Sequence, residues 1–487
     1  MDYKYKFKTK PYKHQKTALD LGGQRKFFGY FMEMGTGKSK VLIDNIGMLH
    51  MQGELDFALI IAPKGVYRNW VSKEIPEHMP DDIPVRVIRW VAGANKKQQE
   101  EMRSVKDKFD GLTVFVMNVE AFSSVKGKQA GEWLGRAFGH RGMIAIDEST
   151  TIKNHQAKRT KSLTKISQSF KYKRLLTGSP ITKSPLDIFS QAEFLQKGLL
   201  RYDSFYAFQA RYAVLQRRTM GAQSFNQVVG FRNLEELTHM IEQFSYRVLK
   251  KDCLDLPEKT YTVRYVSTTK EQLEMYESLR RHAMVLFDDG EMTSAPAVIT
   301  QLLRLQQILS GHLKTDEGEM ITFPSKRMDA LSELLEEHDG KAIIWSRFRY
   351  DIQQIVEMLN NKFGPGVAAA YYGDTPDDER LRIVQDFQSS SNLRFFVGNP
   401  ATAGYGLTLT EANLVVYYAN DFNLETRMQS EDRAHRIGQH NPVTYVDLIT
   451  EGSIDEKIVK ALRAKIDIGA KVLGEEARQW LTMTPKK

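Results

Sequence analysis

The chain has 487 residues with a single cysteine, and its 69 Lys and Arg residues exceed its 60 Asp and Glu residues to give a formal charge of +9. One cysteine, Cys253, excludes an intramolecular disulfide and a zinc site made of several cysteines. The length suggests about three domains. The positive charge suits a polyanionic partner, but charge alone does not separate DNA from RNA or from an acidic protein.

Neither the amino terminus nor any later segment has the pattern of a membrane or export signal. The first residues, Met1 to Lys6, are charged and no apolar region follows them. No apolar run approaches the roughly 18 residues of a membrane span. A single cysteine also fits a reducing compartment. We therefore expect a soluble, cytoplasmic protein that is not secreted and has no membrane partner.

Short aliphatic runs alternate with polar, helix-compatible stretches in both halves of the chain. In the first half, strands are expected at Phe57 to Ala62, Thr113 to Met117, Met143 to Ile146 and Arg174 to Thr177. In the second half they are expected at Ala342 to Trp345, Val367 to Tyr372, Arg394 to Val397, Leu414 to Ala419 and Val443 to Ile449. This alternation is typical of a parallel sheet wrapped by helices. The sequence predicts an α/β fold with two lobes.

The middle of the chain has a different character. Residues 181–325 contain few strand signals and many helix formers, so we expect helical insertions and a linker there, between lobes at residues 1–180 and 326–487. Four aromatic residues fall at helical spacing and are interpreted as core packing: Phe205, Tyr206, Phe208 and Tyr212. The segment from Gly221 to Gly230 is expected to form an exposed loop or hairpin.

A glycine-rich turn follows the apolar run Phe27 to Met32. Its sequence is Glu33-Met34-Gly35-Thr36-Gly37-Lys38-Ser39. Glycines let backbone N–H groups curl around phosphate oxygens, Lys38 can reach the β and γ phosphates, and the Ser39 hydroxyl can ligate magnesium. The first glycine of the strict GxxxxGK[ST] pattern would fall at Met32. A plain glycine-rich turn before a helix therefore remains the alternative.

Two further clusters carry charges that suit phosphate chemistry. The strand-like run Met143 to Ile146 ends in Asp147 and Glu148, where the first carboxylate can hold magnesium and the second can orient or deprotonate a water. Far downstream, the run Gln429 to Gln439 contains Arg433 and Arg436. If that run is helical, the two guanidiniums lie one turn apart on one face and suit multidentate phosphate contact. A helix cap and a solvated helix face are the alternatives.

In this order and with these gaps, the three motifs resemble the motor ATPases of helicase superfamily two, and most closely the Swi/Snf-like DNA translocases. Other segments continue the resemblance over nearly the whole chain: Lys10 to Gln15, Ala62 to Trp70, Leu175 to Pro180, Leu256 to Tyr276, Lys341 to Phe348, Tyr372 to Arg380, Ala403 to Thr410 and Glu451 to Ile454. The resemblance implies two RecA-like lobes and a DNA-dependent ATPase.

The resemblance also implies roles for individual residues. ATP would be contacted by Gln15, Gly35, Thr36, Gly37, Lys38, Ser39, Gly404, Gly406 and Gln429. Magnesium would be held by Ser39 and Asp147, and catalysis would use Lys38, Asp147, Glu148, Arg433 and Arg436. DNA would be contacted by Pro63, Lys64, Thr177, Arg347 and Thr402, mainly at phosphates and so independently of base sequence. For Lys64 and Arg347, a solvated surface charge is the alternative.

Two positions bear on the family assignment. Ser149 and Thr150 follow Asp147-Glu148 where the family usually has Ala-His, and a hydroxyl cannot carry a proton near neutral pH as histidine can. Asp432 precedes Arg433, the first of the two expected catalytic arginines. Helicases often have glycine at this position, whereas aspartate is usual in the Swi/Snf-like branch. The coupling between hydrolysis and DNA contact is therefore expected to differ in detail, within that branch.

The leading hypothesis is a motor that couples ATP hydrolysis to translocation on duplex DNA or to remodelling of DNA structures. In this architecture the phosphate loop belongs to the first lobe and the arginines to the second, so the lobes would close on ATP. A strand-separating helicase in replication or repair is one alternative, and a nucleotide-gated clamp with negligible hydrolysis is another. We expect a compact monomer with a genome-maintenance role in bacteria or virus-infected cells. The sequence does not identify which proteins the chain binds.

Overall fold

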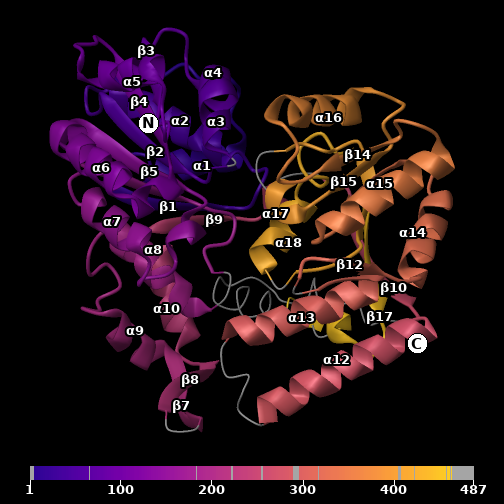
Figure 1. Ribbon diagram of the computed structural model, residues 1–487. Helices are drawn as coiled ribbons and strands as arrows, with labels where there is room; N and C mark the ends of the chain where they lie inside the picture. Colours follow the sequence, from indigo (N-terminus) through magenta and orange to yellow (C-terminus); the bar gives the residue numbers. More distant parts are fainter. Residues whose placement is uncertain are drawn as a thin grey trace. The chain divides into compact units, whose positions relative to one another are not determined.

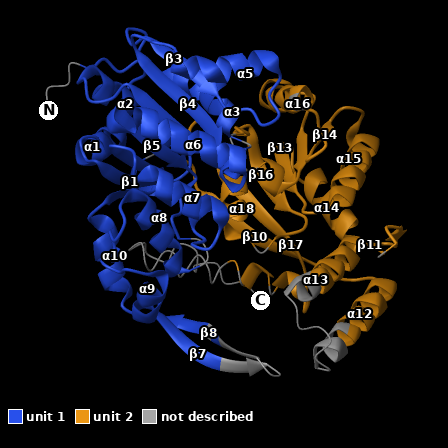
Figure 2. Ribbon diagram, turned by 60° about the vertical axis from the view of Figure 1, so that its left-hand side comes forward, with its two compact units in different colours: residues 1–218, 225–255, 468–476 blue, residues 219–224, 256–467, 477–487 orange. Residues whose placement is uncertain are grey.

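The structure is a computed structural model that describes residues 5–64, 66–181, 184–220, 223–253, 256–288, 295–315, 317–403, 407–421, 423–456, 458–460 and 462. The chain divides into two compact units (Figure 2). Unit 1 is built mainly from residues 1–218 and 225–255, and unit 2 mainly from residues 256–467. None of the helices in the described part of the chain is long and apolar enough to cross a membrane.

Unit 1 is organised around a seven-stranded sheet (Figure 1). Its strands, in spatial order, are β3 (Val85–Arg89), β4 (Leu112–Asn118), β2 (Phe57–Ala62), β5 (Gly142–Asp147), β6 (Tyr172–Leu176), β1 (Phe27–Met32) and β9 (Ser245–Val248). Every neighbouring pair is parallel. All six residues of β2 and of β5 are buried, as expected for central strands covered on both faces.

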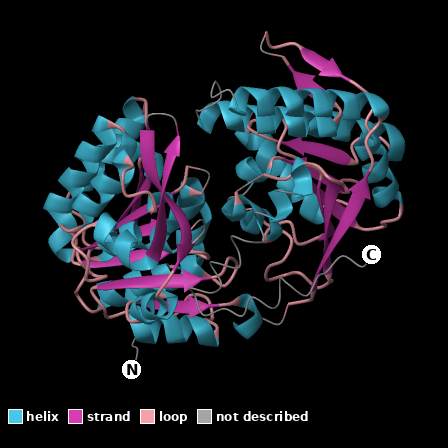
Figure 3. Cartoon of the chain, turned by 90° about the horizontal axis from the view of Figure 1, so that it is seen from below, coloured by secondary structure: helices cyan, strands magenta, loops and turns pink. Residues whose placement is uncertain are grey.

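Helices cover both faces of this sheet (Figure 3). Alternate residues along its strands belong to two hydrophobic cores, one on each face. One face packs against α1 (Lys13–Gly22), α2 (Lys38–Met51), α3 (Tyr67–Asn69) and α4 (Ile75–His78). The other packs against α6 (Val125–Phe138), α7 (Lys158–Ser167), α8 (Ile188–Leu195), α9 (Phe205–Tyr212) and α10 (Leu234–Glu242). α5 (Lys96–Arg103) and α11 (Lys250–Cys253) are the remaining α-helices in the described part of unit 1.

Unit 2 contains a second, six-stranded parallel sheet. Its order is β10 (Lys259–Val266), β17 (Val443–Thr450), β16 (Ala412–Tyr417), β13 (Lys341–Trp345), β15 (Phe395–Gly398) and β14 (Ala368–Tyr371). One core faces α14 (Lys326–Glu336) and α15 (Arg349–Phe363), and the other faces α16 (Asp377–Ser389) and α17 (Pro400–Ala403). The predicted α/β fold with two parallel-sheet lobes is confirmed, and every strand expected from the aliphatic runs is present.

The middle segment contains the expected helices and also strands that the sequence did not suggest. Its helices in unit 2 are α12 (Lys270–Asp288) and α13 (Ala295–Ser310). β7 (Ala213–Met220) and β8 (Gln223–Phe231) form a two-stranded sheet, which is the hairpin alternative expected here, although residues 221–222 lie outside the described residues. β11 (His312–Lys314) and β12 (Met320–Thr322) form another. The boundaries expected at 180 and 325 remain a prediction.

The aromatic residues of α9 only partly follow the expectation of core packing. Phe208 and Tyr212 are fully buried, whereas Tyr206 is 66% exposed. Phe205 is half-buried and stacks on His155, with ring centroids 3.7 Å apart. The expectation is therefore wrong for Tyr206. Only one face of α9 packs against the core, and helical spacing places Tyr206 on the opposite, solvent-exposed face.

Candidate nucleotide and magnesium site

The phosphate loop lies between the end of β1 and the first residue of α2. Gly35 and Gly37 have φ angles of 79° and 86°, in the left-handed region that favours glycine. A Cβ atom added to Gly37 would lie 2.1 Å from Nε2 of Gln15, so a side chain has no space there. The strand, glycine loop and helix occur in the predicted order, at the carboxyl edge of a parallel sheet where ligands of α/β proteins bind.

Helix α1 braces this loop through Thr36, whose side chain is fully buried. The Thr36 carbonyl accepts hydrogen bonds from Nε2 of His14 at 2.8 Å and Nε2 of Gln15 at 3.0 Å. Because a carbonyl only accepts, His14 carries its proton on Nε2. Oε1 of Gln15 accepts from the Tyr12 backbone N–H at 3.0 Å. Both ends of the Gln15 amide are thus engaged by the protein, and its expected role in contacting ATP stays a prediction.

Lys38 points back across the loop. Its Nζ donates to the Glu33 carbonyl at 3.4 Å, and Thr36 Oγ1 donates to the same carbonyl at 2.7 Å. The Glu33 carboxylate accepts from the Lys250 backbone N–H at 2.6 Å, which ties the loop to α11. These contacts hold the loop in its curled conformation and place the Lys38 ammonium where it can receive phosphate oxygens.

Asp147 ends β5 and is held by a hydrogen bond to each oxygen. Trp70 Nε1 donates to Oδ2 at 2.9 Å, and the Glu148 backbone N–H donates to Oδ1 at 3.0 Å. Burial raises the pKa of Asp147, and the positive charge of Lys38 acts in the opposite direction. Glu148 itself has φ 51°, an uncommon conformation for a residue with a side chain, of the kind that clusters at functional sites.

Glu74 is a site residue that sequence reasoning missed. The Ser39 hydroxyl and the charge of Asp147 both lie close enough to the Glu74 carboxylate to interact with it. Burial is the main cause that raises the pKa of Glu74, and the Asp147 charge adds to it. The available signal was the position of Glu74, four residues after Trp70, which ends the family-like segment Ala62 to Trp70.

The donors in this region fit magnesium. Ser39 offers a hydroxyl and Asp147 a carboxylate, and Mg²⁺ prefers oxygen ligands of this kind while keeping several waters. Among the described residues, no three His, Cys, Asp or Glu side chains are arranged to hold a metal by themselves. One carboxylate together with nucleotide phosphates is the usual way in which proteins bind this ion.

In unit 2, the expected helix stops before the arginine pair. α18 spans Leu424–Glu431, and Asp432 is its C-cap. Nε of Arg433 donates to the Gln429 carbonyl at 2.8 Å. A side chain therefore satisfies one of the carbonyls in the last turn of the helix. The prediction that Arg433 and Arg436 lie one turn apart on a helix required this run to be helical, and it is therefore wrong.

The two guanidiniums nevertheless converge. Nη1 of Arg433 and Nη1 of Arg436 donate to the Leu407 carbonyl at 3.2 and 3.0 Å. Arg433 is buried and Arg436 is half-buried. The turn that holds them is anchored by the Gln439 amide, which donates to the carbonyls of Thr410, Ala412 and Ala434. Gly404 and Gly406, expected to contact ATP, lie outside the described residues.

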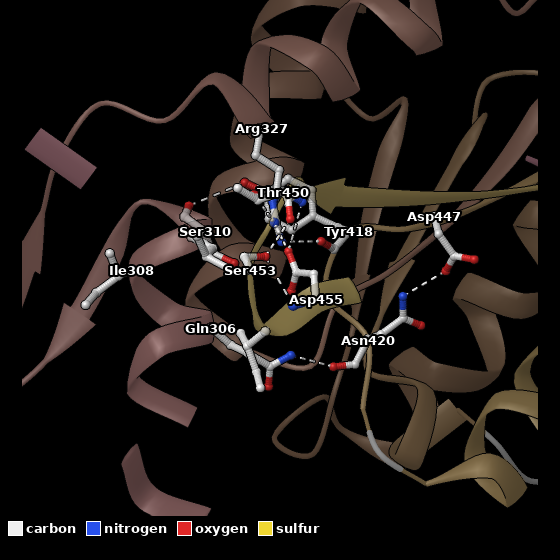
Figure 4. Close-up of polar contacts among 12 residues, drawn as sticks. Gln306, Ile308, Ser310, Arg327, Tyr418, Asn420, Asp447, Thr450, Ser453 and Asp455 are labelled. Atoms are coloured by element: carbon white, nitrogen blue, oxygen red, sulfur yellow. Dashed lines mark hydrogen bonds and ion pairs between the residues drawn. The ribbon is translucent and has the colours of Figure 1, made fainter. Parts of the chain in front are cut away.

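A buried polar network holds α18 to the sheet. Arg427 donates to Glu431 at 2.7 Å, to Asn420 at 2.8 Å and to Asp447 at 2.5 Å, and its guanidinium lies 3.4 Å from the Tyr417 ring centroid. Asn420 also donates to Asp447 at 2.7 Å (Figure 4). Gln429, expected to contact ATP, lies buried on the same helix with its amide 3.4 Å from Glu425 Oε1.

With both halves of the expected site described, the comparisons with known proteins decide the family. Residues 30–312 match the SNF2-related domain family, and residues 326–438 match the helicase conserved C-terminal domain. The chain belongs to the SNF2-related family. This confirms the expected resemblance to the Swi/Snf-like branch of superfamily two.

Relatives occur in bacteria and eukaryotes. The putative ATP-dependent helicase/translocase YwqA of Bacillus subtilis is 26% identical over 92% of this chain and 46% of its own length. The SWI/SNF chromatin-remodeling complex subunit snf22 of Schizosaccharomyces pombe is 27% identical over 91% of this chain and 26% of its own. The chain thus spans less than half the length of these relatives. The Sulfolobus solfataricus SWI2/SNF2 ATPase core in complex with dsDNA is 24% identical with a TM-score of 0.43, covering 94% of this chain and 91% of that one.

In this SNF2-related chain, Ser149 links Asp147-Glu148 to the segment Leu175 to Pro180, which is part of the resemblance to the family. Its hydroxyl donates to Gln191 Oε1 at 2.6 Å, and the Gln191 amide donates to the Pro180 carbonyl at 2.7 Å. Thr177, expected to contact DNA, is buried, and its Oγ1 accepts from the Ser179 N–H at 3.1 Å. A buried hydrogen-bonded connection thus starts at Ser149, where the family usually has alanine.

The residues expected to contact DNA lie at the carboxyl ends of strands in both units. In unit 1, Lys64 is exposed just after β2, while Pro63 is buried and its carbonyl accepts from the N–H groups of Val66 and Tyr67.

In unit 2, Asn399 hydrogen-bonds to both Arg347 and Thr402. Its side-chain amide donates to the Arg347 backbone carbonyl at 2.8 Å, and its backbone carbonyl accepts from the Thr402 N–H at 3.1 Å. Arg347 Nη1 also reaches Gln306 at 3.4 Å, and Gln306 donates to the Asn420 carbonyl (Figure 4).

Proposed function

We propose that the chain is a DNA-dependent ATPase that couples ATP hydrolysis to translocation on duplex DNA or to remodelling of DNA structures. The observation that carries the proposal is the buried Asp147 carboxylate, hydrogen-bonded at both oxygens and close enough to Lys38 of the phosphate loop for their charges to interact. Keeping a charged carboxylate buried is unfavourable unless a cation offsets it. Family membership supplies the second support.

Each unit-1 residue then has a defined task. The loop N–H groups and Lys38 bind the β and γ phosphates, and Ser39 and Asp147 hold magnesium. Bound magnesium neutralises negative charge on the phosphates. Glu148, next in the chain, orients the attacking water and accepts its proton. Its backbone N–H donates to Asp147 Oδ1, so the Asp147 carboxylate is held against the backbone of Glu148.

Arg433 and Arg436 supply positive charge to the γ-phosphoryl group in this proposal. Arginine fingers contribute on the order of a thousandfold or more to kcat. In the structure both guanidiniums donate to the Leu407 carbonyl, so they would exchange that acceptor for phosphate oxygens when the units close on ATP. The split site itself remains a prediction, because each unit is described by itself.

DNA contacts in the proposal come from Pro63, Lys64, Thr177, Arg347 and Thr402, with the phosphate backbone as the ligand. Such contacts do not depend on base sequence, and binding weakens steeply as salt is raised. The protein is proposed to act as a cytoplasmic monomer.

The deciding experiment measures ATP turnover with closed circular duplex DNA, single-stranded DNA and RNA, alongside strand displacement. Stimulation by intact duplex without displacement supports translocation. Displacement of a strand points to a helicase instead, and no turnover with any nucleic acid refutes both.

The assigned phosphate loop is tested by Lys38→Ala. The variant is expected to lose ATP turnover because the phosphates lose their cation, while its circular dichroism spectrum stays unchanged. Lys161→Ala, an exposed lysine of α7, is the matched control and should keep full turnover. Hydrolysis that survives Lys38→Ala would show that the loop is assigned incorrectly.

A further inference from the structure

A single turn of helix hydrogen-bonds to Asp147 and lies beside Ser39, the two residues expected to hold magnesium. The turn Trp70–Glu74 lies between α3 and α4 and is π-helical: the Ile75 backbone N–H donates to the Trp70 carbonyl, five residues back. At its first residue, the Trp70 indole donates to Asp147 Oδ2 at 2.9 Å. At its last residue, the Glu74 carboxylate lies close enough to the Ser39 hydroxyl to interact with it. Single π-helical turns are rare and occur frequently at functional sites.

The Trp70 contact fixes the direction of the Asp147 carboxylate. An indole N–H can only donate, so this hydrogen bond has one possible polarity. Since the Glu148 N–H occupies Oδ1 and Trp70 occupies Oδ2, the carboxylate plane is held at both ends. Each oxygen still has a lone pair for a cation. The contact therefore orients the ligand without blocking it.

The Glu74 contact acts on Ser39 in a complementary way. A hydroxyl has one proton and two lone pairs. When Ser39 donates its proton to the Glu74 carboxylate, both lone pairs are left for a cation. Glu74 is itself held by Nδ2 of Asn69, which donates to Oε1 at 3.1 Å. A Ser39 hydroxyl that donates to Glu74 is thus available to a cation as an acceptor.

We propose that Trp70 and Glu74 are positioning residues for magnesium: they hold Asp147 and Ser39 in the orientation in which both can bind the ion beside the nucleotide. The inference rests on the proposed function, since it concerns the same site. It predicts that the turn Trp70–Glu74 sets how much magnesium strengthens nucleotide binding, while it leaves nucleotide binding without magnesium unchanged.

A purely structural role makes a different prediction. Trp70 is fully buried in the core that faces α2. If it served only packing, Trp70→Phe would weaken nucleotide binding equally with and without magnesium, through general loosening of the loop. The ratio of the two affinities therefore separates positioning from packing.

The experiment is calorimetric titration of the full chain with ADP, in Mg²⁺ and again in EDTA. In Trp70→Phe the ring remains and the donor is lost. In Glu74→Gln the size remains and the charge is lost. Both variants should lose about tenfold of the affinity that magnesium adds, as expected for one hydrogen bond to a charged group. Affinity for ADP in EDTA should match the unmodified chain.

The matched control is Trp90→Phe, the same substitution in the same unit. The Trp90 Nε1 atom is buried without a hydrogen-bond partner among the described residues, so the change removes no donor from an acceptor. It should leave the magnesium gain intact. Thermal unfolding of each variant shows whether it folds, and Glu74→Gln carries the test if Trp70→Phe does not.

Three outcomes are distinguishable. If both variants keep the full magnesium gain, or lose affinity equally in EDTA, the positioning role is overturned while the proposed ATPase stands. If the unmodified chain gains nothing from magnesium, the proposed function fails. A loss confined to magnesium in the two variants, with Trp90→Phe unchanged, supports the inference.

Discussion

Asp147 shows how a single residue can favour function at the expense of stability. Burial raises its pKa, so the folded chain binds its proton more tightly than the unfolded chain does. The free energy of unfolding therefore falls as pH rises from about 4, the ordinary value of an aspartate, through the raised folded-state pKa. Wherever this carboxylate is ionised, its burial lowers the free energy of unfolding.

Asp147→Asn should remove the pH dependence that this carboxylate causes. Its amide can accept only one of the two hydrogen bonds, from Trp70 or from Glu148, so the pH dependence and not the absolute stability is the test. From pH 5 to pH 7 the free energy of unfolding should fall more in the unmodified chain than in the variant, and ATP turnover should be lost because the neutral amide binds magnesium poorly. Urea unfolding at the two pH values measures the first effect. Asp107→Asn, an exposed aspartate, should change stability by less than about 0.5 kcal/mol and keep the pH dependence of the unmodified chain. An Asp147→Asn variant that loses as much stability between pH 5 and pH 7 as the unmodified chain would contradict this account.

Cys253 offers a second test at the residue scale. Burial, followed by the charges of Glu33 and Asp252, raises the pKa of the thiol to about 11. Since only the thiolate reacts, iodoacetamide at pH 8 should modify Cys253 about a hundredfold more slowly than a free cysteine. The rate should rise about tenfold for each pH unit up to pH 10. Mass spectrometry follows the reaction, with the urea-unfolded chain as control; equal rates in the folded and unfolded chain would refute the raised pKa.

At the scale of elements, α18 depends on Arg427. The side chains of Arg427, Glu431 and Asp447 are each at most 10% exposed. Removing the cation leaves two buried carboxylates short of a partner, so Arg427→Met should destabilise the fold by about 3–5 kcal/mol. Arg349→Met is the control, because Arg349 and its partner Asp374 are 59% and 64% exposed and such pairs contribute about 1 kcal/mol at most. Urea midpoints give the comparison, and equal shifts would show that the network does not anchor the helix.

The sequence predicted elements well where one local signal dominated. Central strands such as β2 are continuous aliphatic runs, and they were found where expected. β9 and β10 were missed because they are sheet-edge strands with the mixed sequences SYRV and KTYTVRYV. Their place depends on pairing with distant segments, as when Gly29 of β1 aligns with Ser245.

The candidate site shows the same division. The glycine loop, Asp147 and Arg433 could be identified from short motifs. What holds them could not, because Trp70 lies 77 residues before Asp147 and Leu407 lies 26 residues before Arg433. Contacts over such separations leave no periodic pattern in the sequence. The end of α18 at Glu431 also escaped prediction, since Arg433 caps the last turn by a side-chain contact.

At the scale of the whole molecule, the predicted catalytic groups are divided between the two units. Lys38, Asp147 and Glu148 belong to unit 1, and Arg433 and Arg436 to unit 2. If unit 1 supplies most of the nucleotide affinity, loss of an arginine affects the chemical step more than binding.

Arg433→Ala and Arg436→Ala should each lower kcat on the order of a thousandfold, while ATP affinity changes by less than about fivefold. Single-turnover hydrolysis and equilibrium binding of ATP measure the two quantities. Arg382→Ala, an exposed arginine of α16, should change neither. A loss confined to binding would contradict the proposed role of the two arginines in the chemical step.

The contact between Glu33 and α11 has a practical consequence. The Glu33 carboxylate accepts the Lys250 N–H at 2.6 Å, and α11 ends at Cys253, the one thiol of the chain. A fluorophore attached there, slowly and at raised pH, needs no engineered cysteine and lies on the helix that is hydrogen-bonded to the glycine loop. If the loop binds phosphates as proposed, the emission should follow nucleotide loading in real time, one molecule after another, without any substitution in the chain.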